Sequence, residues 1–335
     1  MVSEPVNYDA VLYLSFGGPE GMSDVLPYLD NVLRGRRVPE SRKREVAHHY
    51  ESLGGRSPIN EQNRAVIEAL ETKLREGGHS IPVYFGNRNW HPLLPDTLRQ
   101  MATDGVRRAL AFVTSAYSSY SGCRQYRENI TEARLEVGDS APEIDKIRAF
   151  YNHPLFVEAN ADHLRTAMGR IQETDRSEAV VLFTAHSVPL RMAETSDYEI
   201  QLRETCRLVA ECVGIDSWKL VYQSRSGAPH QPWLEPDVCD EMKQLARDGV
   251  RHVAVAPIGF LSDHMEIVFD LDTEAADLAK TLGINLVRVS TAGCHPAYIS
   301  MIVELIEERT DPGAPCRALG DQGPRPHECP KGCCR

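Results

Sequence analysis

This chain of 335 residues lacks several features, and each absence excludes a class of protein. No apolar run is long enough to cross a bilayer, because the longest, 250–261, is interrupted by Arg251, His252 and Pro257. The N-terminal MVSEPVNYDA contains no apolar core of a secretory signal. Basic residues are not in excess, and a net charge of −11 argues against nucleic-acid binding. These absences predict a cytoplasmic protein with no membrane insertion and no nucleic-acid partner.

Short apolar runs alternate with amphipathic stretches along the chain, which is too long for one ordinary core and fits two domains. This alternation favours parallel sheets with helices on both faces, an α/β fold. The runs expected as strands are 10–15, 82–85, 108–114, 179–184, 219–222, 253–258 and 285–289. The expected helices include 60–76, 96–104, 198–212 and 237–248.

The sequence also repeats itself. VLYLSFGGPEGM (11–22) aligns with VLFTAHSVPLRM (181–192), and DGVRRALAFV (104–113) aligns with DGVRHVAVAP (248–257). Two matches in the same order predict a duplicated doubly wound domain. We therefore expect two similar Rossmann-like domains, 1–154 and 155–310, with a cleft between them and a cysteine-containing tail, 311–335.

The repeat places Phe16 and His186 at equivalent strand ends, and Tyr120 and His264 at equivalent places after the second matched strand. Ligands of such folds bind outside the carboxyl ends of the strands. If the halves face each other, Phe16 and His186 approach from opposite walls, which suits a flat ligand held between the domains.

An acidic row follows the strand 253–258. Glu266, Asp270 and Glu274 recur every four residues, so they share one face of the expected helix. Like charges at that spacing repel, which favours a bound cation. A solvated acidic face is the alternative on spacing alone.

His186 lies in FTAHSVP, directly after an expected strand. An imidazole is a base near neutral pH and a ligand of iron(II), although a histidine here could equally cap or fill the core. His186 from one strand end and Glu266 from another would make a weak, open cation site, which suits metal transfer.

A basic and hydroxyl-rich cluster precedes the first expected helix. Arg34 lies in VLRGRRVP, and Tyr50 and Ser57 lie in HYESLGGRSP. Guanidinium groups and hydroxyls are natural partners of ligand carboxylates, while a solvated loop is the alternative. SAYSSYSGCRQY, which ends at Tyr126, could form an amphipathic pocket wall or a polar turn.

Four of the nine cysteines crowd into the tail, and without a secretory signal they do not indicate a disulfide framework. Thiolates at such spacing bind zinc or an iron–sulfur cluster, which four cysteines usually hold. Adjacent side chains seldom reach one centre easily, and a frayed tail with free thiols is the alternative. The candidate ligands are Cys123, Cys316, Cys329, Cys333 and Cys334.

Several segments resemble the ferrochelatase family over about residues 10–310. They are LSFGGPEGMSDVLPYL, HYESLGGRSPIN, DGVRRALAFVTSAYSSYSG, FTAHSVP and GFLSDHMEIVFDLDTE. The resemblance implies insertion of Fe²⁺, a substrate, into a porphyrin held in the cleft between two Rossmann-like domains. FTAHSVP and SDHMEI disfavour a cobalt chelatase for sirohydrochlorin-type rings, which shares this fold.

The resemblance also implies roles for particular residues. His186 and Glu266 match the metal site, and Asp270 and Glu274 continue its acidic row. Neutral His186 would accept a pyrrole proton with help from Glu266 while the ring is held out of plane. The residues that match the porphyrin pocket are Phe16, Arg34, Tyr50, Ser57, Arg88 and Tyr126.

The segment SDVLPYLDNVLRGRRVPESRKREV is charged and short of apolar runs, so it is similar to the soluble bacterial branch that metallates coproporphyrin III. A protoporphyrin IX ferrochelatase and a non-enzymatic haem- or iron-sensing protein are the alternatives. Phe16 stands where some members of that branch have tyrosine, so a tyrosinate ligand is not expected.

The cysteine tail resembles that of cluster-bearing ferrochelatases, which implies a [2Fe-2S] cluster on four of the five candidates. Cys123 fits the mid-chain ligand, and Cys329, Cys333, Cys334 and Cys316 compete for the other places. A monomer or weak dimer that contacts another haem-pathway enzyme is the expected assembly.

Overall fold

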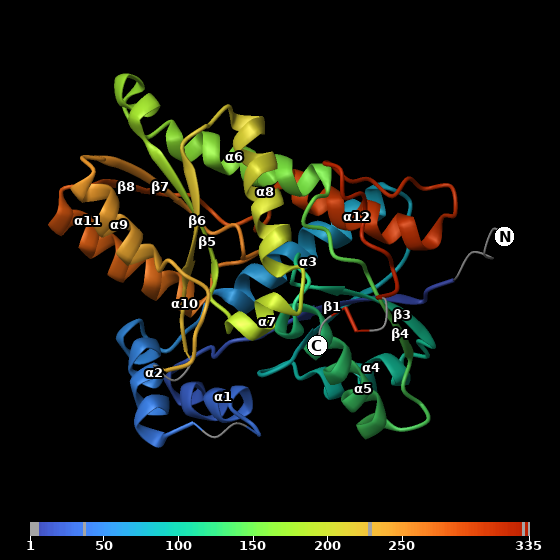
Figure 1. Cartoon of the computed structure of the whole chain (residues 1–335). Coiled ribbons are helices and arrows are strands. Elements are labelled where there is room, and N and C mark those ends of the chain that lie inside the picture. The colour runs from blue at the N-terminus through green and yellow to red at the C-terminus, as the bar shows by residue number, and fades with distance from the viewer. Residues whose placement is uncertain (1–6, 36–37, 227–229, 330–331, 334–335) are drawn as a thin grey trace.

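A computed structural model of the chain describes residues 7–35, 38–226, 230–329 and 332–333. Two parallel sheets of four strands each organise these residues (Figure 1). The first sheet has the order β2-β1-β3-β4, and the second has the order β6-β5-β7-β8. The strands are β1 (Ala10–Ser15), β2 (Val83–Asn87), β3 (Arg108–Val113), β4 (Glu143–Lys146), β5 (Val180–His186), β6 (Trp218–Gln223), β7 (His252–Ala256) and β8 (Asn285–Arg288).

The two sheets have the same topology, because each strand of the first has its counterpart four strands later. This confirms the predicted α/β fold with two similar doubly wound parallel sheets. The boundary expected after residue 154 coincides with the start of α6 (Pro154–Met168), and one sheet lies on each side of it. The division into two domains stays a prediction, since the largest buried core includes residues from both halves.

Every apolar run that was expected as a strand forms one, with ends shifted by a few residues. The strand that sequence reasoning missed is β4, whose sequence EIDK is polar and half-exposed at the sheet edge. An edge strand with one neighbour needs few apolar residues, so it carries little hydrophobic signal.

Helices flank both sheets, and α12, in the last part of the chain, packs against α3 and α6 (Figure 1). Among the described residues, no helix combines the length and the apolar character that a membrane crossing requires. Besides α6, the helices are α1 (Val25–Val32), α2 (Glu40–Ser52), α3 (Ile59–Glu76), α4 (Leu94–Thr103), α5 (Gln125–Val137), α7 (Leu190–Glu194), α8 (Tyr198–Val213), α9 (Val238–Arg247), α10 (Met265–Ile267), α11 (Ala276–Leu282) and α12 (Pro296–Thr310).

The largest core joins the two sheets through aromatic side chains. Phe112 on β3 stacks on Phe150 at 5.3 Å between ring centroids, and it meets Tyr298 of α12 at 6.4 Å. Phe156 of α6 lies 6.4 Å from the same tyrosine ring. Phe183 of β5 belongs to this continuous cluster as well, so the halves share one hydrophobic interior.

A separate small core packs α1 and α2 against the second half of the chain. Tyr28 and Tyr50 meet edge to face at 5.7 Å, and Met265 of α10 is buried with them. Phe16 and Trp90 pack on the outside of this cluster. The cluster therefore brings the residues after β1 and the residues after β7 into one place.

The tail after α12 has little regular structure but is tied to the body by polar contacts. Asn152, which is fully buried, donates to the carbonyl oxygens of Leu319 at 3.1 Å and Gly323 at 2.9 Å. Arg325 pairs with Asp197 at 2.9 Å. The tail is thus a docked segment whose path is set by hydrogen bonds.

Candidate active site

The candidate site begins where β5 ends, at His186. The loop after β7 crosses this strand end closely, because the Gly259 amide donates to the Thr184 carbonyl at 3.0 Å. A Cβ at Gly259 would lie 2.7 Å from Ala185 Cα, so only glycine permits the approach. This contact carries residues 260–266 to the side of His186.

His186 and Glu266 face each other across a short gap. His186 Nδ1 lies against the Ser187 carbonyl oxygen, so this nitrogen carries the proton in the neutral ring. Nε2 therefore presents its lone pair, 3.7 Å from Glu266 Oε2. Two acceptors at this distance form no hydrogen bond with each other, and a proton or a cation between them would satisfy both.

A second histidine, His264, lies near the same carboxylate oxygen, with its Nδ1 3.9 Å from Glu266 Oε2. Burial lowers the pKa of His264, although Glu266 opposes the shift. The half-exposed Glu266 thus has two imidazole nitrogens near one of its oxygens, at 3.7 and 3.9 Å.

The acidic row continues along a π-helix (Val268–Ala275, η4) rather than the α-helix expected from the sequence. Hydrogen bonding from residue i to i+5 still brings residues four and five apart onto one face, so Glu266, Asp270 and Glu274 remain neighbours. Burial raises the pKa of Asp270 to about 7, and the charges of Glu266 and Glu274 contribute to the rise. Short π-helical segments are frequent at functional sites.

Two donors from the end of β6 hold Asp270. Gln223 Nε2 donates to Asp270 Oδ2 at 3.2 Å, and Ser224 Oγ donates to the same oxygen. Ser224 has φ of 60°, in the left-handed region that a serine seldom adopts. The backbone strain at Ser224 and its bond to Asp270 occur together, which is typical of a functional site.

The far end of the row meets α9. Burial raises the pKa of Glu274, and the nearby Asp237 carboxylate adds to the rise. Burial raises the pKa of the Cys239 thiol to about 12, with Asp237 and Glu274 contributing. Negative or potentially negative groups therefore extend from Glu266 to the start of α9.

Phe16 follows β1 and is held by its backbone, because its carbonyl oxygen accepts from the Asn89 amide and from Asn89 Nδ2, both at 3.1 Å. The Arg88 guanidinium lies 5.4 Å from the Phe16 ring centroid and 4.4 Å from that of Tyr126. Its Nε donates to Asn129 at 2.7 Å. The structure thus brings Phe16, Arg88 and Tyr126 together.

The other predicted pocket residues occupy different environments. Tyr50 is buried beside Met265, and the Glu266 charge adds to the effect of burial in raising the pKa of Tyr50. Ser57 is buried under the turn after β1, where a Cβ at Gly18 would lie 2.7 Å from Ser57 Cβ. Arg34 is exposed and donates to Asn31 at 2.6 Å. Only Arg34 of these three presents its polar group at the surface.

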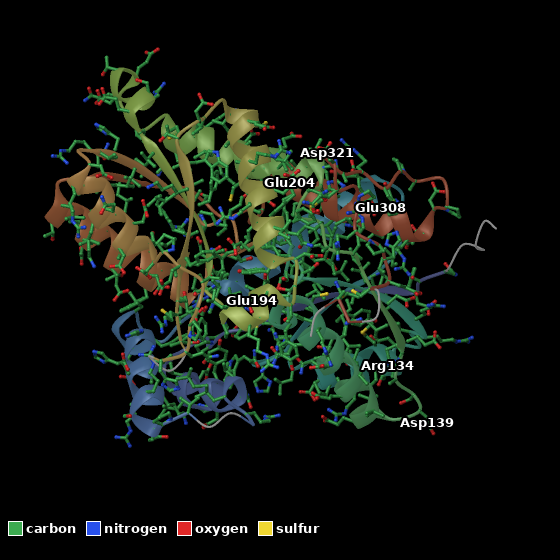
Figure 2. All side chains as sticks on the ribbon, in the orientation of Figure 1. Arg134, Asp139, Glu194, Glu204, Glu308 and Asp321 are labelled. Carbon is green, nitrogen blue, oxygen red and sulfur yellow. The ribbon has the colours of Figure 1, made fainter. Side chains whose placement is uncertain are left out.

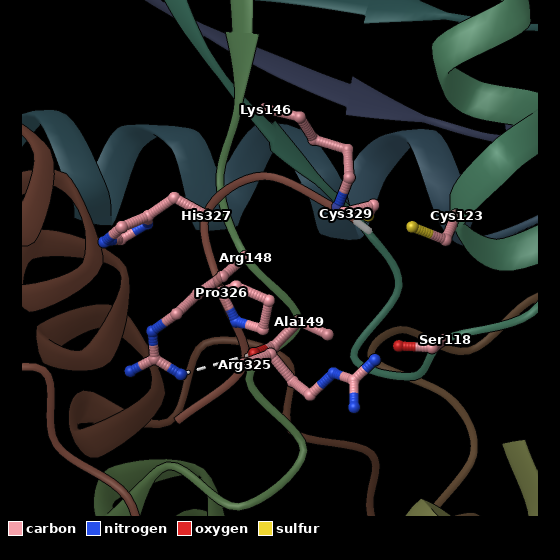
Figure 3. A pocket seen from close by; sticks show the side chains of 9 residues that line it. All are labelled: Ser118, Cys123, Lys146, Arg148, Ala149, Arg325, Pro326, His327 and Cys329. Carbon is pink, nitrogen blue, oxygen red and sulfur yellow. Dashed lines mark hydrogen bonds between the residues drawn. The ribbon is translucent and has the colours of Figure 1, made fainter. Parts of the chain in front are cut away.

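The cysteines of the tail separate into two places. Hydrogen bonding between the Cys329 thiol and Cys123, together with burial and contact with Cys333, raises the pKa of Cys329. In Figure 3 the Cys123 sulfur points toward Cys329, while His327 points to the opposite side. Cys316 lies elsewhere, with its Sγ 3.8 Å from His327 Nε2. Cys334 lies outside the described residues.

Sequence reasoning missed three residues of this site as functional groups. His264 lies in the SDHMEI motif and matches Tyr120 in the repeat, so a signal for it existed. Gln223 and Ser224 follow β6 in the run YQSR, and nothing in that run indicates contact with Asp270. Their position follows from the sheet, which places the ends of β5 and β6 side by side.

Comparison with known proteins decides the family. The model of the family described as ferrochelatase matches residues 8–310. The chain belongs to the ferrochelatase family. A ferrochelatase is a lyase that takes Fe²⁺ and a porphyrin as substrates. A relative named ferrochelatase, from Rhodopirellula baltica, is 53% identical over 334 residues, which cover 99% of this chain and 95% of that protein.

Other similar ferrochelatases carry a more specific name. A coproporphyrin III ferrochelatase from Streptomyces griseus is 47% identical, with 99% of this chain and 94% of that protein covered. Among solved structures, SirB from Bacillus subtilis with Fe³⁺ matches with a TM-score of 0.57 at 13% identity, covering 91% of this chain and 96% of that one. The likeness to SirB extends to the fold alone.

Proposed function

We propose that this ferrochelatase inserts Fe²⁺ into coproporphyrin III to give Fe-coproporphyrin III in haem biosynthesis. Relatives from Streptomyces griseus and Nocardia farcinica, both 47% identical, carry the name coproporphyrin III ferrochelatase. The polar helix α2 (ESRKREVAHHYES) and the exposed Arg34 before it suit a substrate with many carboxylates. Protoporphyrin IX is the alternative substrate.

A side-by-side rate assay tests the substrate. Hydrogen bonds to charged groups contribute about 1.5–3 kcal/mol each. We therefore expect kcat/KM for Fe²⁺ insertion to be roughly tenfold or more higher with coproporphyrin III than with protoporphyrin IX. A preference for protoporphyrin IX would overturn the substrate. Binding of either ring without insertion would favour a sensing role instead.

The catalytic pair in this proposal is His186 and Glu266. The observation that carries it is the 3.7 Å gap between His186 Nε2 and Glu266 Oε2, with Nδ1 occupied by the Ser187 carbonyl. Nε2 is thereby the nitrogen that accepts a pyrrole proton, and Glu266 accepts the other proton or binds the incoming iron. The location as a cytoplasmic monomer or weak dimer, and contact with another haem-pathway enzyme, remain predictions.

Phe16 and its neighbours would supply the opposite wall. The ring of Phe16 offers an apolar face, and Arg88, stacked between it and Tyr126, offers a fixed positive charge at the edge. In this arrangement the macrocycle contacts Phe16, Arg88, Tyr126 and Arg34, and contacts remote from the metal hold the ring out of plane. Tyr50 and Ser57 are buried, so they would touch the ring only after the residues that cover them move.

The acidic row is proposed as the route by which iron reaches the pair. Asp270 and Glu274 continue from Glu266, and Asp270 is fixed by Gln223 and Ser224. Carboxylates bind Fe²⁺ weakly enough to release it, which a supply route requires. The competing explanation is that these carboxylates are simply solvated and carry no iron. The effect of Ser224→Ala on KM for Fe²⁺, given in the Discussion, separates the two explanations.

Two substitutions test the pair. Glu266→Gln and His186→Ala should each lower the rate of iron insertion by about 100-fold or more, because a positioned acid or base contributes at least that factor. Porphyrin binding, measured by fluorescence quenching, should change little. Glu173→Gln, at an exposed site in the short 3₁₀ helix Glu173–Glu178, is the control. If both variants inserted iron at the wild-type rate, His186 and Glu266 would not be the catalytic pair.

We also propose that Cys123, Cys329 and Cys333 hold a [2Fe-2S] cluster together with one more cysteine. The contact of the Cys329 thiol with Cys123 and Cys333 supports this set. Cys316 is a poor fourth ligand, because its thiol lies with His327 and Glu308 instead. Cys334 is the remaining candidate from the tail.

Visible absorption of the purified protein tests the cluster. Cys123→Ser should abolish the absorption of a thiolate-bound iron–sulfur cluster, whereas Cys294→Ser, at an exposed cysteine before α12, should preserve it. Protein that is colourless although produced without oxygen and with ample iron would contradict the proposal.

A further inference from the structure

We infer that Glu308, Cys316 and His327 form a second, mononuclear metal site for a zinc-type divalent cation, which ties the tail to α12. One ligand atom from each residue lies within 4.8 Å of the others. Glu308 is on α12, as Figure 2 labels it, and the other two belong to the tail. The site is independent of the proposed substrate and of the His186–Glu266 pair.

The separation of the ligand atoms fits tetrahedral zinc. Zinc binds thiolate sulfur at about 2.3 Å and imidazole nitrogen at about 2.0–2.1 Å, which at a tetrahedral angle puts sulfur and nitrogen roughly 3.6 Å apart. Cys316 Sγ and His327 Nε2 are 3.8 Å apart. The Cys316 thiol also reaches Glu308, so the three groups converge on one point.

Arg148 orients the carboxylate of this set. Its Nε and a terminal nitrogen each donate to one oxygen of Glu308 at 2.7 Å, and both side chains are buried. Each carboxylate oxygen keeps a second lone pair, which can bind a cation. Outer hydrogen bonds of this kind commonly fix the orientation of carboxylates that bind metals. Because Arg148 offsets the charge of Glu308, the Cys316 thiolate is the anionic ligand that remains to offset the charge of the cation.

Among the described residues, His327 has no strong hydrogen bond that would explain its placement. Its Nδ1 is buried and has no hydrogen-bond partner within the described part of the chain, and its Nε2 has only the weak contact with Cys316. A neutral imidazole in this position offers a ring-nitrogen lone pair to a cation. A bound cation would hold this ring.

The chemistry of the set differs from that of an iron–sulfur cluster. Clusters are usually held by four thiolates, whereas one thiolate, one imidazole and one carboxylate with an open fourth position fit zinc. A cation bound to residues 308, 316 and 327 would fix the segments of the tail between these ligands. The last ligand, His327, stands two residues before Cys329. The site would therefore hold Cys329 next to Cys123 as well.

Metal titration of the full chain tests the site. After chelator treatment, the wild-type protein should bind about one equivalent of Zn²⁺, and Co²⁺ used as a probe should give thiolate-to-cobalt absorption. Cys316→Ser and His327→Gln should each lower Zn²⁺ affinity at least tenfold and remove the Co²⁺ band, since outer or direct ligands commonly account for 10–100-fold. Both variants leave the Arg148–Glu308 pair in place, so they should fold.

Controls separate this site from the cluster cysteines. Cys294→Ser should bind Zn²⁺ like the wild type, and Cys123→Ser should keep Zn²⁺ while losing cluster absorption. Zinc at wild-type stoichiometry in both Cys316→Ser and His327→Gln would overturn the inference, and so would a wild type that takes up neither metal. Loss of the cluster with retention of zinc in Cys316→Ser would make Cys316 a cluster ligand and would also overturn it.

Discussion

Ser224 is the residue whose role in this site is easiest to isolate. Its hydroxyl donates to Asp270, and a hydrogen bond to a charged group contributes about 1.5–3 kcal/mol. We expect Ser224→Ala to raise KM for Fe²⁺ about tenfold while porphyrin KM stays the same. Ser300→Ala, on α12, is the matched control. If KM for Fe²⁺ were unchanged, the hydrogen bond from Ser224 to Asp270 would have no role in iron binding.

The pKa of Asp270 predicts a pH dependence of stability. Burial raises that pKa from 3.8 to about 7, so between these values the folded state binds more protons than the unfolded state. Stability from this group is therefore lost as pH rises from about 4 to about 7. Asp270→Asn should gain stability relative to wild type across this window.

Urea unfolding at several pH values measures this difference. The advantage of Asp270→Asn should grow up to about pH 7 and then level off. Asp139→Asn, in the turn after α5 that Figure 2 labels, is the control. A constant difference between Asp270→Asn and wild type at every pH would show that the carboxyl titrates normally.

Among the residues of the candidate site, those that lie in short sequence motifs could be predicted from the sequence. His186 and Glu266 stand in FTAHSVP and SDHMEI, and the structure brings them together at 3.7 Å. Gln223 and Ser224 could not be predicted, because their contact with Asp270 depends on β6 pairing with β5. Ser57 was expected to contact the ligand, yet it is buried under Gly18, and that role stays a prediction.

At the scale of elements, the π-helix Val268–Ala275 shows where periodicity stops being informative. The spacing of Glu266, Asp270 and Glu274 suits an α-helix and a π-helix alike, since residues four apart stay on one face in both. The two helix types differ in hydrogen-bond register, which side-chain spacing does not encode, and Leu271 and Ala275 are buried in the core of the second sheet. The sequence could thus predict the row but not the helix type.

An aromatic contact joins helix α2 to this π-helix. His49 stacks on Phe269 with ring centroids 3.9 Å apart. Aromatic pairs contribute about 0.5–1.5 kcal/mol beyond area burial, so Phe269→Ala should speed amide exchange in α2 roughly two- to tenfold. Hydrogen-exchange mass spectrometry measures this, with Ile200→Ala, an exposed site on α8, as control. Unchanged exchange would mean that the small core with α1 and Met265 holds α2 without Phe269.

At the scale of the whole molecule, the repeat was the most informative sequence pattern. It predicted two sheets of the same topology, and the strand orders confirm this. It could not predict that α12 packs against α3 from the other half, because the likeness of two segments does not say how they pack on each other. The shared core follows from this packing.

A shared core predicts that the halves unfold together. Phe156→Ala should lower the free energy of unfolding by about 3–5 kcal/mol, as expected for a large buried aromatic. Single-tryptophan variants that retain Trp90 or Trp218 should report the same transition midpoint before and after the change. Leu135→Ala, at an exposed site on α5, should cost less than about 0.5 kcal/mol. Separate midpoints for the two reporters would contradict a common core.

The continuity of that core also limits how a large flat molecule can enter. Rotation of one half about a hinge would separate Phe112 from Tyr298 and break the main hydrophobic interior. The contacts of α1 and α2 with Met265 form a small core of their own, which is far less costly to part. Entry and exit would then proceed by a local swing of a two-helix lid, with the sheets remaining a rigid frame, and the rate of that swing would set an upper limit on turnover.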